Sequence, residues 1–272
     1  MMATYLPRPP GRQPLHTPTA MDMFNAYRKM FATLDDELVV WWYCGGVVSH
    51  REGVGAVPHV QAETLMVYRT RDVSAECFTI DWTEVGYFRD ITTGELLQGW
   101  FNPFSQRTEP YPRSFVDGPA TFTVQRAGDG VDVQLVQHNA RIDGVQVAAS
   151  LNEHSVGLVQ TETKTRTFHR PDGSLPPLDS PEATQIETVL SIWSPRAAVN
   201  DTQVRNAAGH GFYRSGSRGA GAGGSWAATV VSGTMCKGGV DERVNPQAWQ
   251  RLLQLYPDFF SADGQRVAPR FD

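Results

Sequence analysis

The sequence has little cysteine, no long apolar run and no cluster of basic residues, and each absence excludes a class of protein. Only three of its 272 residues are cysteines, and no two of them form a CxxC pair. This pattern indicates neither a disulfide framework nor a structural zinc site. We interpret Cys44, Cys77 and Cys236 as reduced thiols of a cytoplasmic protein. The formal net charge of -5 and the lack of a Lys/Arg run give no attraction to nucleic acid or to anionic lipid.

The N-terminal stretch, residues 1–20, is rich in proline and contains no apolar run. This is not the pattern of a secretory signal or of a membrane anchor. We expect an extended arm, which either stays disordered or lies across a neighbouring subunit of a homo-oligomer. Both outcomes stay open. The charge and the lack of an apolar run argue against nucleic acid and membrane as partners. The partner that we expect is a small hydrophobic molecule.

What the sequence does contain indicates a strand-rich soluble domain. Its apolar content of 40% is ordinary for a soluble protein, whereas its 25 glycines and 18 prolines are typical of many turns and little helix. Apolar residues at three- and four-residue spacing predict a helix over residues 21–34, and Asn245-Pro246 begins a second helix that ends before Pro257. Residues 21–272 then form one domain, because no linker or repeat interrupts them.

Extended segments separated by short turns occupy most of the chain between the two helices. The continuous apolar run at residues 38–44 predicts a central strand. Further strands are expected at residues 59–71, 76–90, 120–126, 132–139, 145–151, 156–169, 182–193 and 226–236. After the turn at residues 93–95, a returning strand over residues 96–103 is expected to pair antiparallel with the strand before it. Loops are expected at residues 47–58, at the proline-rich residues 104–119 and at the glycine-rich residues 215–225. This regular alternation of strand and turn is typical of a meander.

One strand carries polar residues on both of its faces. Between residues 161 and 168, threonines alternate with Glu162, Lys164 and Arg166. A barrel lining and a wide, partly exposed sheet both account for this pattern. We expect Glu162 and Glu187 to face outward. If Glu162 faces inward instead, it needs partners, and Lys164 and Arg166 are available.

Four short patterns resemble the DUF1838 family of bacterial and fungal proteins. They are VVWWY at residues 39–43, EVGYF at 84–88, TGE at 93–95 and WFNP at 100–103. The likeness runs from about Met21 to the C-terminal helix and weakens beyond Pro195. It implies a mainly β fold: a single antiparallel β-barrel-like domain, similar to the calycin or lipocalin barrels that enclose small hydrophobic ligands, with an N-terminal and a C-terminal helix. The family brings no catalytic assignment.

The hairpin around residues 81–103 holds the strongest candidates for catalysis. Asp81, Glu84 and Arg89 lie among aromatic residues, and a carboxylate beside an Arg can act as a tuned general base or anchor a polar group. The alternative is a solvent-exposed turn without a function, which would contain the same residues. His138 and His210 are further candidates for proton transfer, because histidine titrates near neutral pH.

Aromatic residues are the candidates for binding a substrate. A flat apolar wall with one polar handle suits a ligand pocket, although core packing explains the same residues. The candidates are Trp41, Tyr43, Tyr68, Tyr87 and Trp100.

The familiar metal and cofactor motifs are missing. The sequence contains no HxH, HxxxH, HExxH or GxSxG pattern. The glycines at 219, 221 and 224 match GxGxxG but lack the strand, helix and acidic residue of a dinucleotide site. We therefore expect neither a metal nor a cofactor.

The leading hypothesis is a cofactor-independent lyase or isomerase that moves a proton on a small hydrophobic, for example aromatic, metabolite. The alternative is a carrier or sensor that binds such a ligand without changing it, and a structural module is a third. The catalytic hypothesis requires Asp81, Glu84 and Arg89 to converge on one cavity.

Overall fold

The computed structural model describes residues 21–51, 55–102, 106–109, 113–167, 174–219, 227–238, 246–264, 266–269 and 271. The expected N-terminal arm lies outside the described residues. So does the expected glycine-rich loop from residue 220 onward, whereas its first part, residues 215–219, continues a strand.

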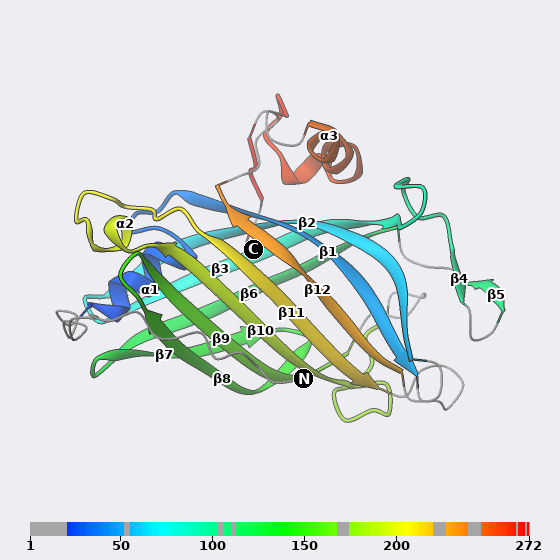
Figure 1. Cartoon of the computed structure of the whole chain (residues 1–272), viewed down its shortest axis with the longest axis horizontal. Coiled ribbons are helices and arrows are strands. Elements are labelled where there is room, and N and C mark those ends of the chain that lie inside the picture. Colours follow the sequence, from blue (N-terminus) through cyan, green and yellow to red (C-terminus); the bar gives the residue numbers. More distant parts are fainter. Residues whose placement is uncertain are drawn as a thin grey trace, which may run out of the picture.

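The fold is mainly β: ten antiparallel strands form a nearly closed barrel with a short helix near each end of the chain (Figure 1). The barrel strands are β1 (Leu38–Arg51), β2 (Gly55–Ser74), β3 (Cys77–Asp90), β6 (Ser114–Ala127), β7 (Gly130–Gln137), β8 (Ala140–Leu151), β9 (Ser155–Arg166), β10 (Thr184–Pro195), β11 (His210–Gly219) and β12 (Ala227–Lys237). A separate two-stranded sheet contains β4 (Trp100–Asn102) and β5 (Arg107–Glu109). The helices are α1 (Met23–Phe31), α2 (Arg196–Asn200), α3 (Pro246–Leu255) and the 3-10 turn η1 (Pro257–Phe259). The predicted fold class is confirmed.

Barrel strands that follow one another in the chain pair with one another, as in a meander, except for β7 and β8. The strand order is β7-β6-β3-β2-β1-β12-β11-β10-β9-β8, so β12 returns to pair with β1. The two ends of this order, β7 and β8, lie side by side. Among the described residues no backbone ladder joins them, and we call this junction the seam.

Two loop predictions are wrong in part. Within residues 47–58, β1 continues to Arg51 and β2 begins at Gly55, and the two strands stay paired, with Val48 opposite Pro58. Within residues 104–119, β5 and the start of β6 are paired strands. The predicted pairing of residues 96–103 with β3 is limited to the bridge between Arg89 and Leu96, since β4 pairs with β5 and β3 pairs with β6. Backbone hydrogen bonds need no particular side chain, so glycine-rich and proline-rich sequence can still join a ladder where its neighbours hold it. The strand β11 carried no clear sequence signal.

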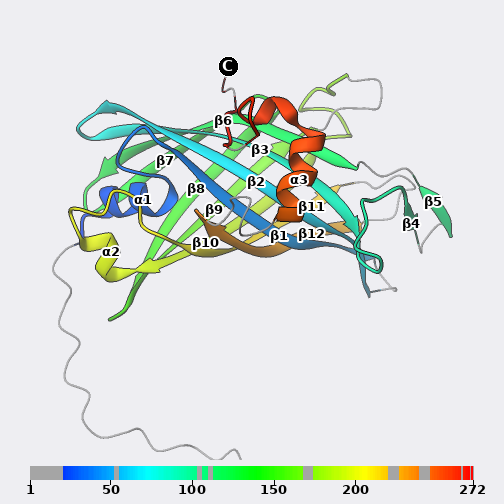
Figure 2. The same ribbon diagram turned by 90° about the horizontal axis from the view of Figure 1, so that it is seen from above.

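Helix α1 fills one end of the barrel, opposite the end where β4 and β5 lie (Figures 1 and 2). Its apolar face packs into the main core. The indole of Trp41 in β1 donates to the carbonyl oxygen of Phe31 at 2.9 Å. The ammonium of Lys237 in β12 donates to the carbonyls of Lys29 and Ala32, which lack partners within the helix. These contacts fix the closed end of the barrel.

Helix α3 covers part of the outer face of the barrel (Figure 2). Outward side chains of β1, β2 and β3 form a second apolar cluster with it. The buried members are Trp42, Leu65, Val85, Tyr87, Ala248, Trp249, Leu252 and Phe260. None of the helices in the described part of the chain is long and apolar enough to cross a membrane.

Candidate functional site

A cavity lies inside the barrel. Successive side chains of a strand point to opposite faces, so every barrel strand sends alternate residues inward. The cavity has a volume of about 420 Å³, and a chamber of about 80 Å³ adjoins it toward Phe31 of α1. Its walls are largely apolar and include Val47, Met66, Phe88, Phe115, Ile186 and Val231. A volume of this size falls within the usual range for small-molecule sites.

Glu84 lines both chambers. Among the described residues none hydrogen-bonds to its carboxyl group. Burial, and next the nearby carboxylate of Asp117, raise the pKa of Glu84 from 4.5 to about 8, while the cations of Arg166 and Lys164 act in the opposite direction. Glu84 is therefore mostly a neutral carboxylic acid at pH 7.

Asp117 and Arg166 form an ion pair beside Glu84. Two guanidinium nitrogens of Arg166 donate to the two carboxylate oxygens at 2.6 and 2.5 Å. Asp117 faces inward because the pairing of β3 with β6 shifts register between Trp82 and Glu84. At the shift, Gly118 has a φ of +94°, which favours glycine. The bulge reverses which residues of β6 point inward.

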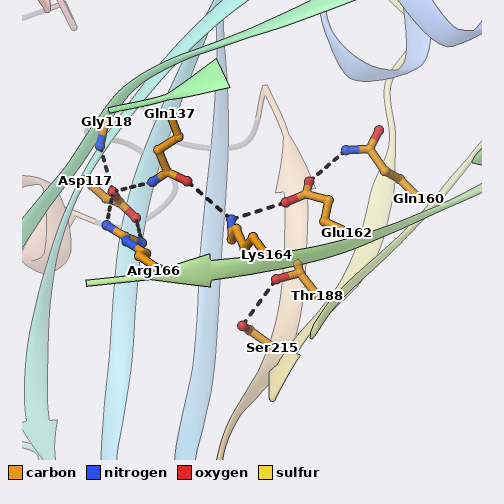
Figure 3. A network of polar contacts seen from close by, with 9 residues as sticks. All are labelled: Asp117, Gly118, Gln137, Gln160, Glu162, Lys164, Arg166, Thr188 and Ser215. Carbon is orange, nitrogen blue, oxygen red and sulfur yellow. Dashed lines mark hydrogen bonds and ion pairs between the residues drawn. The ribbon is translucent and has the colours of Figure 1, made fainter. Parts of the chain in front are cut away.

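From Asp117 a chain of polar contacts runs along the interior toward α1 (Figure 3). Gln137 donates to Asp117 at 3.1 Å and accepts from the ammonium of Lys164 at 3.4 Å. Lys164 also contacts Glu162 at 3.3 Å. Gln160 donates to Glu162 at 2.8 Å, and the phenol of Tyr27 in α1 donates to Gln160 at 2.6 Å.

This chain corrects the expected orientation of Glu162. The prediction that it faces outward is wrong, because β9 places its even-numbered residues inside, in line with the fully buried Leu158. Lys164 is its partner, as the inward alternative required. Glu187 does face outward and is exposed.

Tyr43 points a buried phenol into the cavity. Its side chain lies over Gly45, where a β-carbon would overlap the phenol oxygen, and its ring packs edge-on against Tyr213 at a centroid distance of 5.5 Å. The residue is 4% exposed, and its hydroxyl has no hydrogen-bond partner among the described residues. Burial raises the pKa of Tyr43 well above its usual value, so the phenol keeps its proton.

Asp81 and Arg89 do not converge with Glu84, contrary to what the catalytic hypothesis required of the three. Both occupy odd positions of β3 and lie on the outer face of the barrel wall. Asp81 pairs with Arg71 and accepts from Thr121 at 2.8 Å. Arg89 lies 2.6 Å from the carboxylate of Glu63.

Of the five aromatic candidates for substrate binding, two line the cavity and three do not. Tyr43 lines the larger chamber and Tyr68 the smaller one. Trp41 is fully buried in the core beside α1. Tyr87 lies on the outer face below α3 and donates to Glu63, and Trp100 lies in β4 outside the barrel strands.

The two histidine candidates are exposed and do not belong to the cavity lining. His138 lies in the turn between β7 and β8, and His210 begins β11. No histidine lines either chamber within the described ranges. The part of the chain that the structure describes also contains no group of three or more His, Cys, Asp or Glu residues that could hold a metal ion.

Sequence reasoning did not select Asp117 or Arg166 as site residues, and it named Tyr213 only as a companion of His210 in proton transfer. The alternation of threonine with charged residues in β9 contained the signal for Arg166, since a barrel lining was one of its two interpretations. Tyr213 belongs to a strand that was not predicted. The inward turn of Asp117 depends on the bulge at Gly118, which the sequence did not indicate.

Comparisons with known proteins add little to this description. No family model matches the chain, and no curated protein matches it. Among solved structures, Ail, the attachment invasion locus protein of Yersinia pestis in complex with the heparin analogue sucrose octasulfate, covers 75% of this chain and 99% of its own at 8% identity and a TM-score of 0.23. A further structure of Ail gives 9% identity and a TM-score of 0.25 over the same shares. A likeness this weak carries no argument about fold or function.

Proposed function

We propose that the protein is a cofactor-independent lyase or isomerase that transfers a proton to a small hydrophobic substrate inside the barrel. One observation carries the proposal: Glu84, a carboxyl group with its pKa raised to about 8, faces an otherwise largely apolar cavity of about 420 Å³. A carboxyl group with a pKa near the working pH is suited to general acid–base catalysis. A cytoplasmic location belongs to the same proposal and agrees with the three free thiols.

Glu84 begins the reaction as the acid, because it holds its proton at pH 7. It donates that proton to an oxygen atom of the substrate, and the phenol of Tyr43 donates a hydrogen bond to the same oxygen, which orients it for the transfer. The cations of Arg166 and Lys164 lower the pKa of Glu84 and so favour its ionised form. The resulting carboxylate then takes a proton from a neighbouring carbon of the substrate. Glu84 thus ends in its starting state, and no cofactor is consumed.

The outer-face residues Asp81 and Arg89 have no part in this scheme. The ion pair of Asp117 with Arg166 has an indirect part, since the two charges act on Glu84 in opposite directions. Burial is the main cause of the raised pKa of Glu84, and these two charges adjust that pKa in opposite directions. Asp117 is therefore a positioning residue.

A carrier or sensor of a small hydrophobic ligand is the second candidate function. The apolar walls and the lack of histidine in the described lining favour it. The carboxyl group with a raised pKa favours the enzyme, because a carrier needs no such group. Turnover by the wild-type protein separates the two.

The experiment is a screen of aromatic and terpenoid metabolites for turnover without added cofactor, followed by Glu84→Gln. We expect the variant to lower kcat at least about 100-fold with little change in KM, because the amide keeps the shape but cannot transfer a proton. The activity of the wild type should fall as pH rises through about 8, when the acid loses its proton.

The matched control is Glu187→Gln, an exposed carboxylate on the outer face of the barrel. It should leave kcat and the pH profile unchanged. An unchanged rate in Glu84→Gln would remove Glu84 from the mechanism. Binding of a metabolite by the wild type without any turnover would establish the carrier instead.

A further inference from the structure

We infer that the cavity takes a neutral, largely apolar carbonyl compound, whose oxygen accepts hydrogen bonds from donors in the lining. This inference rests on the proposed function and names its substrate class. Three properties of the lining carry it: its unused donors, its occupied acceptors and its cancelling charges.

Unused donors lie in both chambers. The hydroxyl of Tyr43 and the indole nitrogen of Trp82 are buried, and neither has a hydrogen-bond partner among the described residues. Tyr43 lines the larger chamber and Trp82 the smaller one. An indole N–H can only donate, and a buried donor without an acceptor is costly. A carbonyl oxygen is the complementary group.

Two of the three carboxyl groups that line the chambers are already used as acceptors, and the third, that of Glu84, holds its own proton at pH 7. Asp117 accepts from Arg166, from the backbone of Gly118 at 2.8 Å and from Gln137 at 3.1 Å. Glu162 accepts from Gln160 and Lys164. A ligand whose polar groups are donors alone would find no free carboxylate among these residues.

The charges of the lining cancel one another. Arg166 is paired with Asp117, and Lys164 is paired with Glu162. An anionic ligand would lose its hydration without meeting an unpaired cation, and a cationic one would have to ionise Glu84. The cavity therefore selects against both signs of charge.

The apolar side chains of the lining determine which kind of carbon skeleton the ligand has. Phe88 and Phe115 contribute rings whose centroids lie 5.1 Å apart, and Met66 and Val231 extend the apolar surface. These side chains stabilise an apolar skeleton by burying its surface. A planar aromatic ketone combines such a skeleton with a single acceptor.

Four naphthalenes of similar size test the inference by isothermal titration at pH 6.5: 2-acetylnaphthalene, 2-ethylnaphthalene, 2-naphthoate and 2-naphthylmethylamine. We expect the ketone to bind at least about fivefold more tightly than the hydrocarbon, which corresponds to one net hydrogen bond. The anion and the cation should bind more weakly than the ketone. Infrared spectra should show the carbonyl stretch of the bound ketone at a lower frequency than that of the same ketone without a hydrogen bond, in an apolar solvent.

Tyr43→Phe should remove most of the preference for the ketone over the hydrocarbon and reduce the infrared shift, while affinity for 2-ethylnaphthalene stays the same. Trp82→Phe is a second donor variant with the same expectation for a ligand that reaches the smaller chamber. Tyr87→Phe, on the outer face, is the control and should keep the preference.

Equal binding of ketone and hydrocarbon, tightest binding of a charged probe, or no binding of any of the four would overturn the inference. Its failure is distinguishable from failure of the proposed function. Ketone-selective binding without turnover of any carbonyl compound contradicts the proposed function alone. Turnover of a charged substrate that depends on Glu84 contradicts this inference alone.

Discussion

At the scale of single residues, the chemistry of each carboxylate in β3 depends on the face of the barrel wall that it occupies. Asp81 faces outward and is held by Arg71 and Thr121. Glu84 faces inward, where no described residue hydrogen-bonds to it and burial raises its pKa to about 8. The two residues share a strand but only Glu84 is available to a ligand.

The raised pKa of Glu84 makes the stability of the protein depend on pH. The unfolded chain ionises Glu84 near pH 4.5, whereas the folded protein keeps the proton until about pH 8. Between these values the folded state binds more protons, so this residue lowers the free energy of unfolding by about 1.4 kcal/mol for each pH unit of rise. Glu84→Gln should remove that slope. Urea unfolding at pH 5, 6, 7 and 8 measures it.

Glu187→Gln is again the control, and its stability should follow the wild type at every pH. Because other groups titrate in all three proteins, the informative quantity is the difference between each variant and the wild type. Parallel curves for the wild type and Glu84→Gln would mean that Glu84 is already ionised in the folded protein.

At the scale of elements, β1 illustrates how the alternation of side chains builds the cavity wall. Tyr43, Gly45 and Val47 occupy inward positions, and Gly45 has no side chain because the phenol of Tyr43 lies in that space. Gly46 faces the other way, and a β-carbon at this position would meet no atom within 4 Å. The two neighbouring glycines therefore have different roles.

Gly45→Ala should destabilise the protein by about 1–3 kcal/mol, because its methyl group would overlap Tyr43 and the backbone carbonyl of Ser232. The same change should weaken ligand binding by displacing the phenol. Gly46→Ala should alter stability by no more than about 0.5 kcal/mol. Urea denaturation of both variants measures the difference, and equal effects would contradict the assigned facing of β1.

At the scale of the whole molecule, side chains close the barrel where backbone pairing does not. Among the described residues no ladder joins β7 to β8. Across this seam, Arg166 of β9 holds Asp117 of β6, and Lys164 of β9 contacts Gln137 of β7 at 3.4 Å. The polar interior thus contributes to closure as well as to the site.

A double-mutant cycle on Asp117 and Arg166 tests this contribution. Either Asp117→Asn or Arg166→Met alone should cost about 3–5 kcal/mol, because the remaining partner loses its main counter-charge inside the barrel. The double variant should cost less than the sum, with a coupling of about 0.5–3 kcal/mol. Equilibrium denaturation of the four proteins provides the values.

The control cycle uses Arg141 and Asp143, which lie 3.2 Å apart with side chains 61% and 44% exposed. Coupling there should stay below about 1 kcal/mol, as for solvent-exposed pairs. If the interior pair couples no more strongly than this one, the claim that side chains close the barrel at the seam is wrong.

The sequence by itself determined the periodic features of the protein. Apolar residues at helical spacing located α1 and α3, and strand-length segments between turns predicted a meander. The barrel was implied only by the resemblance to the DUF1838 family. The threonine alternation in β9 placed Glu162, Lys164 and Arg166 on one face. These features are local, because the backbone period alone sets which residues share a side.

Only the tertiary structure decided which side is the inside. A period of two defines two faces of a strand without ranking them when both carry polar residues, so Asp81 and Glu84 were equally plausible until the barrel closed. The register shift at Gly118 then turned Asp117 inward, beside Glu84. That meeting of residues from β3, β6 and β9 depends on strand pairing over long sequence separations, which no local pattern encodes.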